Sequence, residues 1–246
     1  MIQIDNNIKL QRNKQYNDWS RKKPAYISLA IIIVIVLFCG LPDIEIIKGI
    51  GKVWSYLISL TVVSSSLFFF YRFLLTDISR FYPGMLLFSK WLKPTTRLLY
   101  STYGFYTEEQ KKDIRKKIKD KGHKDLETFK NKTSKNRSYV KRVDEAVSWL
   151  LEVTRFDNIL FEYNCLYGFY RNLTAGVLVD ALLLFFMAIV NDKCYTLPHG
   201  SIYFRTGMVL LIITIVLTAL SYMRGMIFAK KMYSVFLNLD DNNDNY

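Results

Sequence analysis

The chain has 246 residues, of which 51% are apolar and 22% charged, with a net charge of +13 and a mean hydropathy of +0.10. A positive mean hydropathy at this charge content indicates that the apolar residues are clustered. The excess of cations favours anionic partners: nucleic acids, nucleotides or acidic lipid. The three cysteines and two histidines are scattered singly, so the sequence predicts neither a disulfide framework nor a metal site.

Four apolar runs stand out in chain order: Tyr26–Gly40, Val53–Thr76, Leu173–Val190 and Thr206–Met223. A transmembrane helix needs about 20 predominantly apolar residues. Buried helices of a soluble protein are the alternative, but four nearly charge-free runs in one short chain are typical of membrane proteins. We therefore predict an all-α, polytopic membrane protein with four transmembrane helices.

The charge distribution predicts the orientation of these helices. Lys and Arg crowd the segment before the first run, and the stretch between the second and third runs carries 20 Lys/Arg against 12 Asp/Glu. Positively charged segments stay in the cytoplasm, which places both termini there. The predicted organisation is a basic N-terminal segment (1–25), a transmembrane hairpin (26–76), a basic and mostly helical cytoplasmic domain (77–171), a second hairpin (172–224) and a cytoplasmic tail (225–246).

Two helices are expected inside the cytoplasmic domain. The first begins with a capping box, Thr107 followed three residues later by Gln110, and ends at Gly122. The second covers Tyr139–Phe156, where apolar residues recur with helical spacing.

Asp180 is the one acid within the third apolar run. A carboxylate at this depth is costly, so it normally faces a pore, a cavity or a partner group. We predict either a pore-lining or gating role or a structural pair with a cation or hydroxyl, for example Arg72.

The fourth run places small and hydroxyl residues on one helical stripe, with Thr214, Thr218 and Ser221 at its centre. Close helix packing is the default interpretation of such a stripe. A hydroxyl-lined aqueous pathway is the alternative, and these three residues are its candidates.

The cytoplasmic domain is strongly basic, with 14 Lys/Arg and four acids between Lys111 and Arg142. Such a run can simply be a solvated face or a response to the anionic inner leaflet. Here, however, cations alternate with aromatic rings, as in binding sites for single-stranded oligonucleotides. The candidate ligand residues from this pattern are Arg137, Lys141, Arg142, Arg155 and Arg171. Neither a nucleophile motif nor a phosphate-binding glycine loop is present, so we expect no enzyme and no cofactor.

Two stretches, Lys93–Tyr100 ("KPTTRLLY") and Glu162–Leu173 ("EYNCLYGFYRNL"), resemble a family of bacterial four-span membrane effectors of anti-phage defence, the channel partner of a nucleotidyltransferase in Hailong-type systems. The resemblance implies an oligomeric channel, a tetramer, in the bacterial inner membrane. It also implies a DNA oligomer, made by a nucleotidyltransferase encoded nearby, that holds the channel closed until infection releases it.

Carried over by position, the resemblance adds Thr95, Thr96, Arg97, Asn164, Tyr167, Arg171 and Asn172 as the ligand or coupling region. Tyr163 and Cys165 depart from the family pattern on either side of Asn164. The leading hypothesis is a ligand-controlled channel or membrane-depolarising effector that senses a nucleotide or DNA oligomer. The alternatives are a non-channel anchor or scaffold that binds anionic lipid or a partner protein, and a small transporter.

Overall fold

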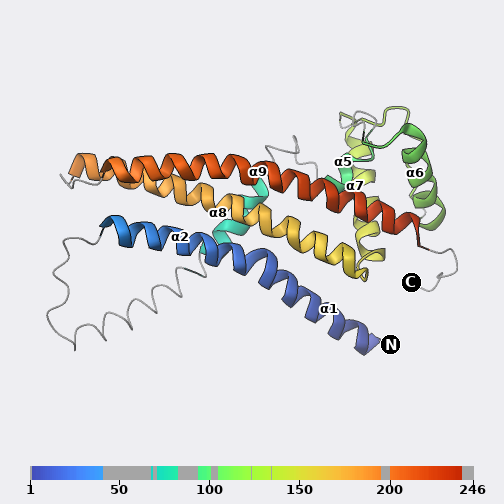
Figure 1. The fold of residues 1–246 in the computed structure, drawn as a ribbon. Coiled ribbons are helices and arrows are strands. Elements are labelled where there is room, and N and C mark those ends of the chain that lie inside the picture. The colour runs from blue at the N-terminus through green and yellow to red at the C-terminus, as the bar shows by residue number, and fades with distance from the viewer. Residues whose placement is uncertain are drawn as a thin grey trace. The chain divides into compact units, whose positions relative to one another are not determined.

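A computed structural model describes residues 2–40, 68, 71–82, 94–100, 105–122, 124–133, 135–194 and 200–239. Its elements are α1 (Ile2–Asn17), the π-helix η1 (Asp18–Lys22), α2 (Lys23–Gly40), a helical stretch at 71–81, α5 (Pro94–Arg97), α6 (Glu108–Gly122), α7 (Arg137–Val153), α8 (Asn158–Cys194) and α9 (Gly200–Leu237) (Figure 1). The described residues contain helices and no strand, which confirms the all-α prediction.

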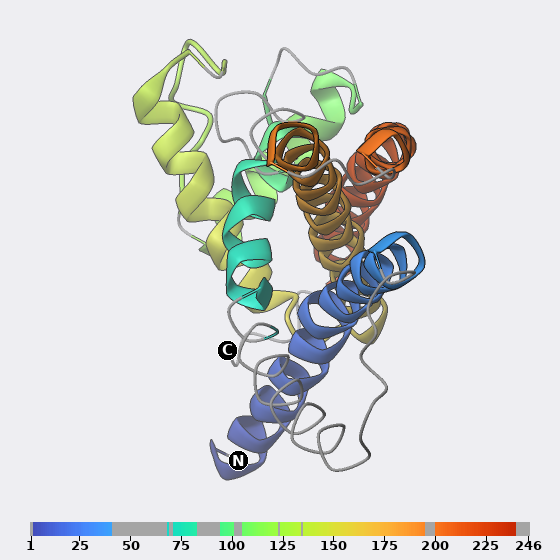
Figure 2. The same ribbon diagram turned by 90° about the vertical axis from the view of Figure 1, so that its left-hand side faces the viewer.

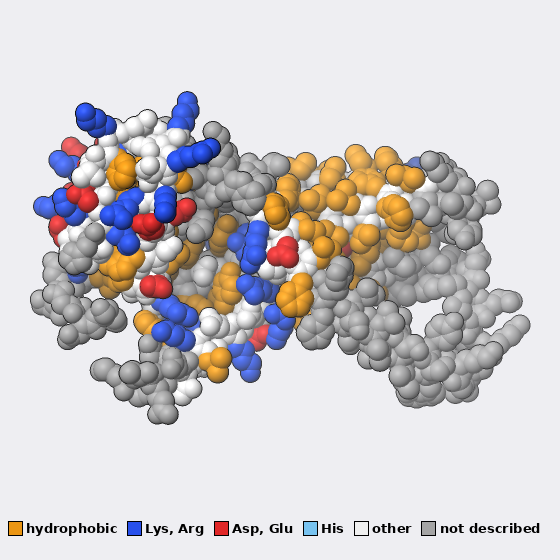
Figure 3. All heavy atoms as spheres, turned by 180° about the vertical axis from the view of Figure 1, so that it is seen from behind, with side chains coloured by type: hydrophobic (Ala, Val, Ile, Leu, Met, Phe, Trp, Pro, Cys, Tyr) orange, Lys and Arg blue, Asp and Glu red, His pale blue; other side chains and the backbone are white. Residues whose placement is uncertain are grey.

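Two helices, α8 and α9, are long and apolar enough to cross a membrane. In α9, only 22% of the most apolar window is buried within the protein, whereas the core helix of a soluble domain would be mostly covered. Exposed side chains such as Phe186 (63%) and Ile215 (64%) suit lipid. Figure 3 shows hydrophobic side chains gathered along part of the described surface, and Lys, Arg, Asp and Glu gathered elsewhere. The first apolar run lies in α2, and most of the second lies outside the described residues.

The chain divides into two compact units. Unit 1 comprises Met1–Pro83 with Gly168–Ser221, and unit 2 comprises Gly84–Tyr167 with Tyr222–Tyr246. Both divisions fall inside a helix, so α8 and α9 each contribute residues to both units. The end of α9, from Tyr222 onward, therefore belongs to the same unit as residues 84–167.

The core of unit 2 is built from α6, α7, the first turns of α8 and the last turns of α9, together with residues 98–100 and Leu126. Leu98, Leu99 and Tyr100 are fully buried. Tyr233 of α9 donates a hydrogen bond to the carbonyl of Thr95 at 2.6 Å. Tyr139 of α7 donates one to the carbonyl of Leu99 at 3.2 Å. The "PTTRLLY" stretch is thus a structural centre of unit 2.

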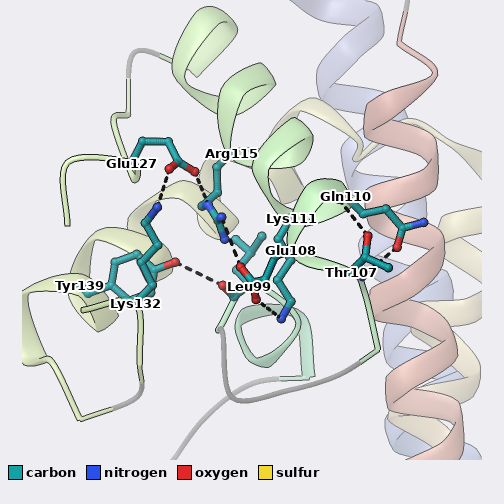
Figure 4. Close-up of polar contacts among 9 residues, drawn as sticks. All are labelled: Leu99, Thr107, Glu108, Gln110, Lys111, Arg115, Glu127, Lys132 and Tyr139. Atoms are coloured by element: carbon teal, nitrogen blue, oxygen red, sulfur yellow. Dashed lines mark hydrogen bonds and ion pairs between the residues drawn. The ribbon is translucent and has the colours of Figure 1, made fainter. Parts of the chain in front are cut away.

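The capping box that begins α6 is present as predicted (Figure 4). The Thr107 amide donates to the Gln110 side-chain oxygen at 3.1 Å, and the Gln110 amide donates to the Thr107 hydroxyl at 3.2 Å. These reciprocal bonds satisfy two backbone donors at the helix start. The second predicted helix is also present, and α7 begins two residues earlier than expected because the Asn136 side chain accepts from the Tyr139 amide.

Candidate functional site: a buried polar seam along helix α8

Four residues of α8 in unit 1 form what we call the α8 seam: Gly168, Asn172, Gly176 and Asp180. They are spaced by four residues, which puts them on one side of the helix. All four are buried, and the helical run from η1 to α2 lies against them. Figures 1 and 2 show α2 and α9 running alongside α8.

The two glycines of the seam allow close approach of serines on the neighbouring helical run. A Cβ added at Gly168 would lie 2.7 Å from the Ser20 Cβ, and one added at Gly176 would lie 2.6 Å from the Ser28 Oγ. Small residues at helix contacts let backbones approach in this way. Gly168 and Gly176 are eight residues apart, as are Ser20 and Ser28, so the two helical runs meet in a parallel register.

Asp180 is fully buried and contacts two hydroxyl groups. The Ser28 hydroxyl oxygen lies 2.5 Å from the Asp180 Oδ2, and the Tyr71 hydroxyl oxygen lies 2.7 Å from the Oδ1, both at hydrogen-bond distance. The two hydroxyl oxygens also lie 2.6 Å from each other. The three side chains come from α8, α2 and the helical stretch 71–81, so the cluster ties three helices of unit 1 together.

For Asp180, a structural pair with a cation or a hydroxyl was one of the two predicted roles. In the structure its partners are the hydroxyls of Ser28 and Tyr71, and not the Arg72 guanidinium. The Arg72 guanidinium lies over the Phe73 ring, 6.0 Å from its centroid. Among the described residues, Asp180 has no ion pair. An ionised carboxylate at the centre of a membrane helix costs about 3 kcal/mol or more. The Asp180 side chain is covered in the described part of the chain, and its two hydroxyl contacts satisfy the carboxyl group there.

Asn172 is the second polar member of the seam. It is 2% exposed, and its side-chain amide donates to the Ser20 carbonyl. Its Oδ1 is buried and has no hydrogen-bond partner among the described residues. The Ser20 hydroxyl in turn donates to the Tyr16 carbonyl at 2.6 Å. Asn172, predicted as a ligand residue, thus fixes the η1 backbone against α8.

Two hydroxyl residues of the predicted stripe on α9 form hydrogen bonds to backbone carbonyls of their own helix. The hydroxyls of Thr214 and Thr218 donate to the carbonyls of Leu210 and Thr214, one turn earlier. Thr218 also lies 3.0 Å from the Tyr82 hydroxyl. Ser221 is buried, and its Oγ has no partner among the described residues. This arrangement agrees with helix packing, and a hydroxyl-lined pathway stays a prediction.

In unit 2, an open hollow of about 830 Å³ runs beside α7. We call it the α7 hollow; it is lined by Lys124, Arg137, Val140, Lys141, Asp144, Glu145, Ser148, Trp149 and Glu152. Two predicted ligand residues, Arg137 and Lys141, are therefore brought together, and Lys124 and Trp149 join them. Along α7, Arg137 and Lys141 precede Asp144, Glu145 and Glu152, and with Lys124 the lining carries three cations and three carboxylates.

The other predicted ligand residues do not line the hollow. Arg142 pairs with Glu145 at 3.3 Å, and the Arg97 guanidinium lies over the Tyr222 ring at 5.8 Å. Tyr167 is buried and stacks on Phe228 at 6.3 Å. Asn164, Arg155 and Arg171 are half-buried. Because Arg171 and Asn172 belong to unit 1 and the rest to unit 2, the predicted set does not form one site within either unit.

Sequence reasoning missed an ion-pair network in unit 2, drawn in Figure 4. Lys111 and Arg115 are only 1% and 3% exposed. Lys111 pairs with Glu108 at 2.9 Å, and Glu127 pairs with both Arg115 and Lys132. Hydrogen bonding by Lys111 lowers the pKa of Glu108. Burial acts to raise the pKa of Glu127, but its contacts with Lys132 and Arg115 lower it overall. The spacing of Lys111, Ile114, Arg115 and Ile118 on one face of α6 could have signalled that both cations are buried.

Comparisons with known proteins give no relative to guide the assignment: no family model matches the chain, and searches of curated proteins and of solved structures find no match.

Proposed function

We propose that this chain is a ligand-controlled membrane channel or membrane-depolarising effector of anti-phage defence, in the bacterial inner membrane with both termini cytoplasmic. The ligand is a nucleotide or DNA oligomer made by a nucleotidyltransferase encoded nearby, and the working form is a homo-oligomer, with a tetramer favoured. The four-span layout and the defence role rest on the resemblance and on the charge pattern. The observation that carries the ligand claim is the α7 hollow.

The chemistry of the hollow matches a nucleotide in three respects. Lys124, Arg137 and Lys141 supply positive charge for phosphates. Trp149, half-buried with its ring edge-to-face to Phe236 at 5.8 Å, supplies a ring whose exposed part can stack on a base, and stacking contributes about 1–3 kcal/mol per base in single-strand binding proteins. Asp144 and Glu152 supply acceptors for the amino groups of bases. A general solubility surface needs neither the ring nor the separation of charge.

Control of the membrane region follows from helix continuity. Helices α8 and α9 each run without interruption from unit 2 into unit 1. A ligand can shift a conformational equilibrium only by its difference in affinity for the two states. We propose that the bound oligomer favours the closed state, in which Asp180 is covered, and that its loss permits an arrangement of copies in which ions pass.

The ligand claim is tested with short single-stranded DNA and the purified full chain. Removal of two cations by Arg137→Ala with Lys141→Ala should weaken binding. For single strands, each phosphate contact contributes about −0.7 to the slope of log affinity against log salt, so the slope should change from about −2 to about −0.7. Lys112→Ala with Lys116→Ala on the exposed face of α6 makes the same change in net charge and serves as the control. Equal binding by both double variants contradicts the site.

The channel claim is tested separately by ion flux from liposomes that contain the full chain. Flux that falls when the DNA oligomer is added supports the proposal. The alternative is a non-channel anchor or scaffold that binds anionic lipid or a partner protein, and the internal hydrogen bonds of Thr214 and Thr218 favour it. No flux with or without the oligomer supports this alternative.

A further inference from the structure

The contacts around Asp180 form a closed ring of three oxygen groups. The Ser28 hydroxyl lies 2.5 Å from the Asp180 Oδ2, the Tyr71 hydroxyl lies 2.7 Å from the Oδ1, and the two hydroxyl oxygens lie 2.6 Å apart. Oxygen atoms at these distances share a proton, because two lone pairs without one repel each other. The ring therefore has three contacts, and each requires its own proton.

The proton count depends on the state of the carboxyl group. Ser28 and Tyr71 bring one hydroxyl proton each, and an ionised Asp180 brings none. With two protons, one of the three contacts is left as a repulsive pair of oxygens. A neutral carboxylic acid supplies the third proton. Asp180 then donates to Ser28, Ser28 donates to Tyr71, and Tyr71 donates to the other oxygen of Asp180.

Among the described residues, no charged side chain forms an ion pair or hydrogen bond with the ring, and the Arg72 guanidinium, next to Tyr71 in the chain, lies over the Phe73 ring. From α8, the stretch Asn172–Asn191 carries no ionisable residue besides Asp180. From α2, Pro24–Gly40 carries no charged residue, and Lys23 lies over the Trp19 ring at 2.9 Å. From α9, Thr206–Ser221 carries no ionisable residue. From the stretch 71–81, Tyr71 is the titratable group that faces the carboxyl.

We infer that the Asp180–Ser28–Tyr71 ring is a proton-binding site in the membrane region, which holds Asp180 as a neutral acid while α2, α8 and the helical stretch 71–81 are packed together. Release of the proton to water leaves two protons for three contacts, so one contact opens. The ring is then a proton-dependent clasp between three helices. The inference stands on the geometry of unit 1 and holds whether or not the chain conducts ions.

Infrared difference spectroscopy on the full chain in lipid vesicles tests the inference directly. The difference spectrum, in which the spectrum of Asp180→Asn is subtracted from that of the wild type, should show the C=O stretching band of a protonated carboxylic acid at neutral pH. This band should disappear as the pH is raised. Asp77→Asn is the matched control, because Asp77 is exposed and pairs with Arg80 at 3.5 Å, so it should contribute no such band.

Two further variants tie the band to the ring. Ser28→Ala and Tyr71→Phe each remove one hydroxyl, so each should shift the frequency of the Asp180 band. The inference is overturned if the wild type lacks an Asp180 band at neutral pH, or if both hydroxyl variants leave the band unchanged. The wild-type titration alone decides the first point, so the result does not depend on the folding of a variant. Since the readout needs no ion flux, a failure here is distinct from a failure of the channel proposal.

Discussion

Replacing Gly176 by Ala tests whether the α8 seam sets the distance between α8 and α2. The new methyl group would lie 2.6 Å from the Ser28 Oγ, 2.8 Å from the Ser28 Cβ and 3.4 Å from the Leu75 Cδ1. The Ser28 Cβ is bonded directly to the α2 backbone, so rotation of the Ser28 side chain cannot move it away from the new methyl group. The helices must separate, and the Ser28 contact with Asp180 must lengthen.

The expected cost combines two effects. Overpacking costs about 1–3 kcal/mol, and the contact with an atom fixed to the backbone places this case near the upper end. The higher helix propensity of Ala returns about 1 kcal/mol. The remainder, about 2 kcal/mol, corresponds to a fall in Tm of about 4–8 °C for a chain of this size.

The assay is thermal unfolding of the purified full chain in detergent, in a double-mutant cycle with Ser28→Gly. In the Ser28→Gly background the new methyl group meets neither the Oγ nor the Cβ, so Gly176→Ala should cost little there. Leu182→Ala, at a side chain 56% exposed on α8, should change the Tm far less than Gly176→Ala. The same loss of Tm in both backgrounds refutes the reasoning, since it shows that Ser28 does not oppose the methyl group.

Three further outcomes are expected. Glu127→Gln leaves Arg115 buried with a weaker partner and should destabilise unit 2 by about 1–3 kcal/mol. This cost is lower than that of breaking a fully buried pair, because Glu127 is partly exposed. Glu109→Gln is the control and should change the free energy of unfolding, measured by chemical denaturation, very little. Burial raises the pKa of Tyr139 to about 12. The contribution of Tyr139 to stability should therefore be complete below the ordinary tyrosine pKa and lost as the pH rises through about 12. In the Tyr139→Phe variant, this alkaline loss should be absent from the pH profile of unfolding. The pKa of Glu108 is lowered, so its stabilising contribution should be present above the ordinary glutamate pKa and should decline in acid. If the wild type and Glu108→Gln show the same acid-unfolding profile, the pairing with Lys111 is contradicted.

Local features of unit 2 could be predicted from sequence because they depend on nearby residues. The capping box at Thr107 and the periodicity of α7 act within a few residues of the chain, and both predictions are confirmed. The buried state of Lys111 and Arg115 could not be read from composition, since a basic run more often faces solvent. It depends on Glu127, which meets Arg115 only when the segment after α6 folds back.

The α8 seam shows the same limit in unit 1. Asp180 could be singled out from its depth in an apolar run, but its partners could not, because Ser28 and Tyr71 are more than 100 residues away in the chain. Hydroxyls in an apolar segment have many possible partners, and the sequence suggests Arg72, the residue next to Tyr71, as a cationic partner. Which of the two faces α8 depends on the rotation of the helical stretch about its own axis, which sequence spacing alone does not fix.

The paired spacing of the seam also bears on how this sequence can diverge. A larger residue at position 168 can be accommodated only if position 20 becomes smaller or the helices separate, and positions 176 and 28 are linked in the same way. We therefore expect these positions to covary in pairs, 168 with 20 and 176 with 28, as homologous sequences accumulate. Position 180 should remain acidic or amidic wherever hydroxyls persist at positions 28 and 71, because each can complete the same ring of hydrogen bonds.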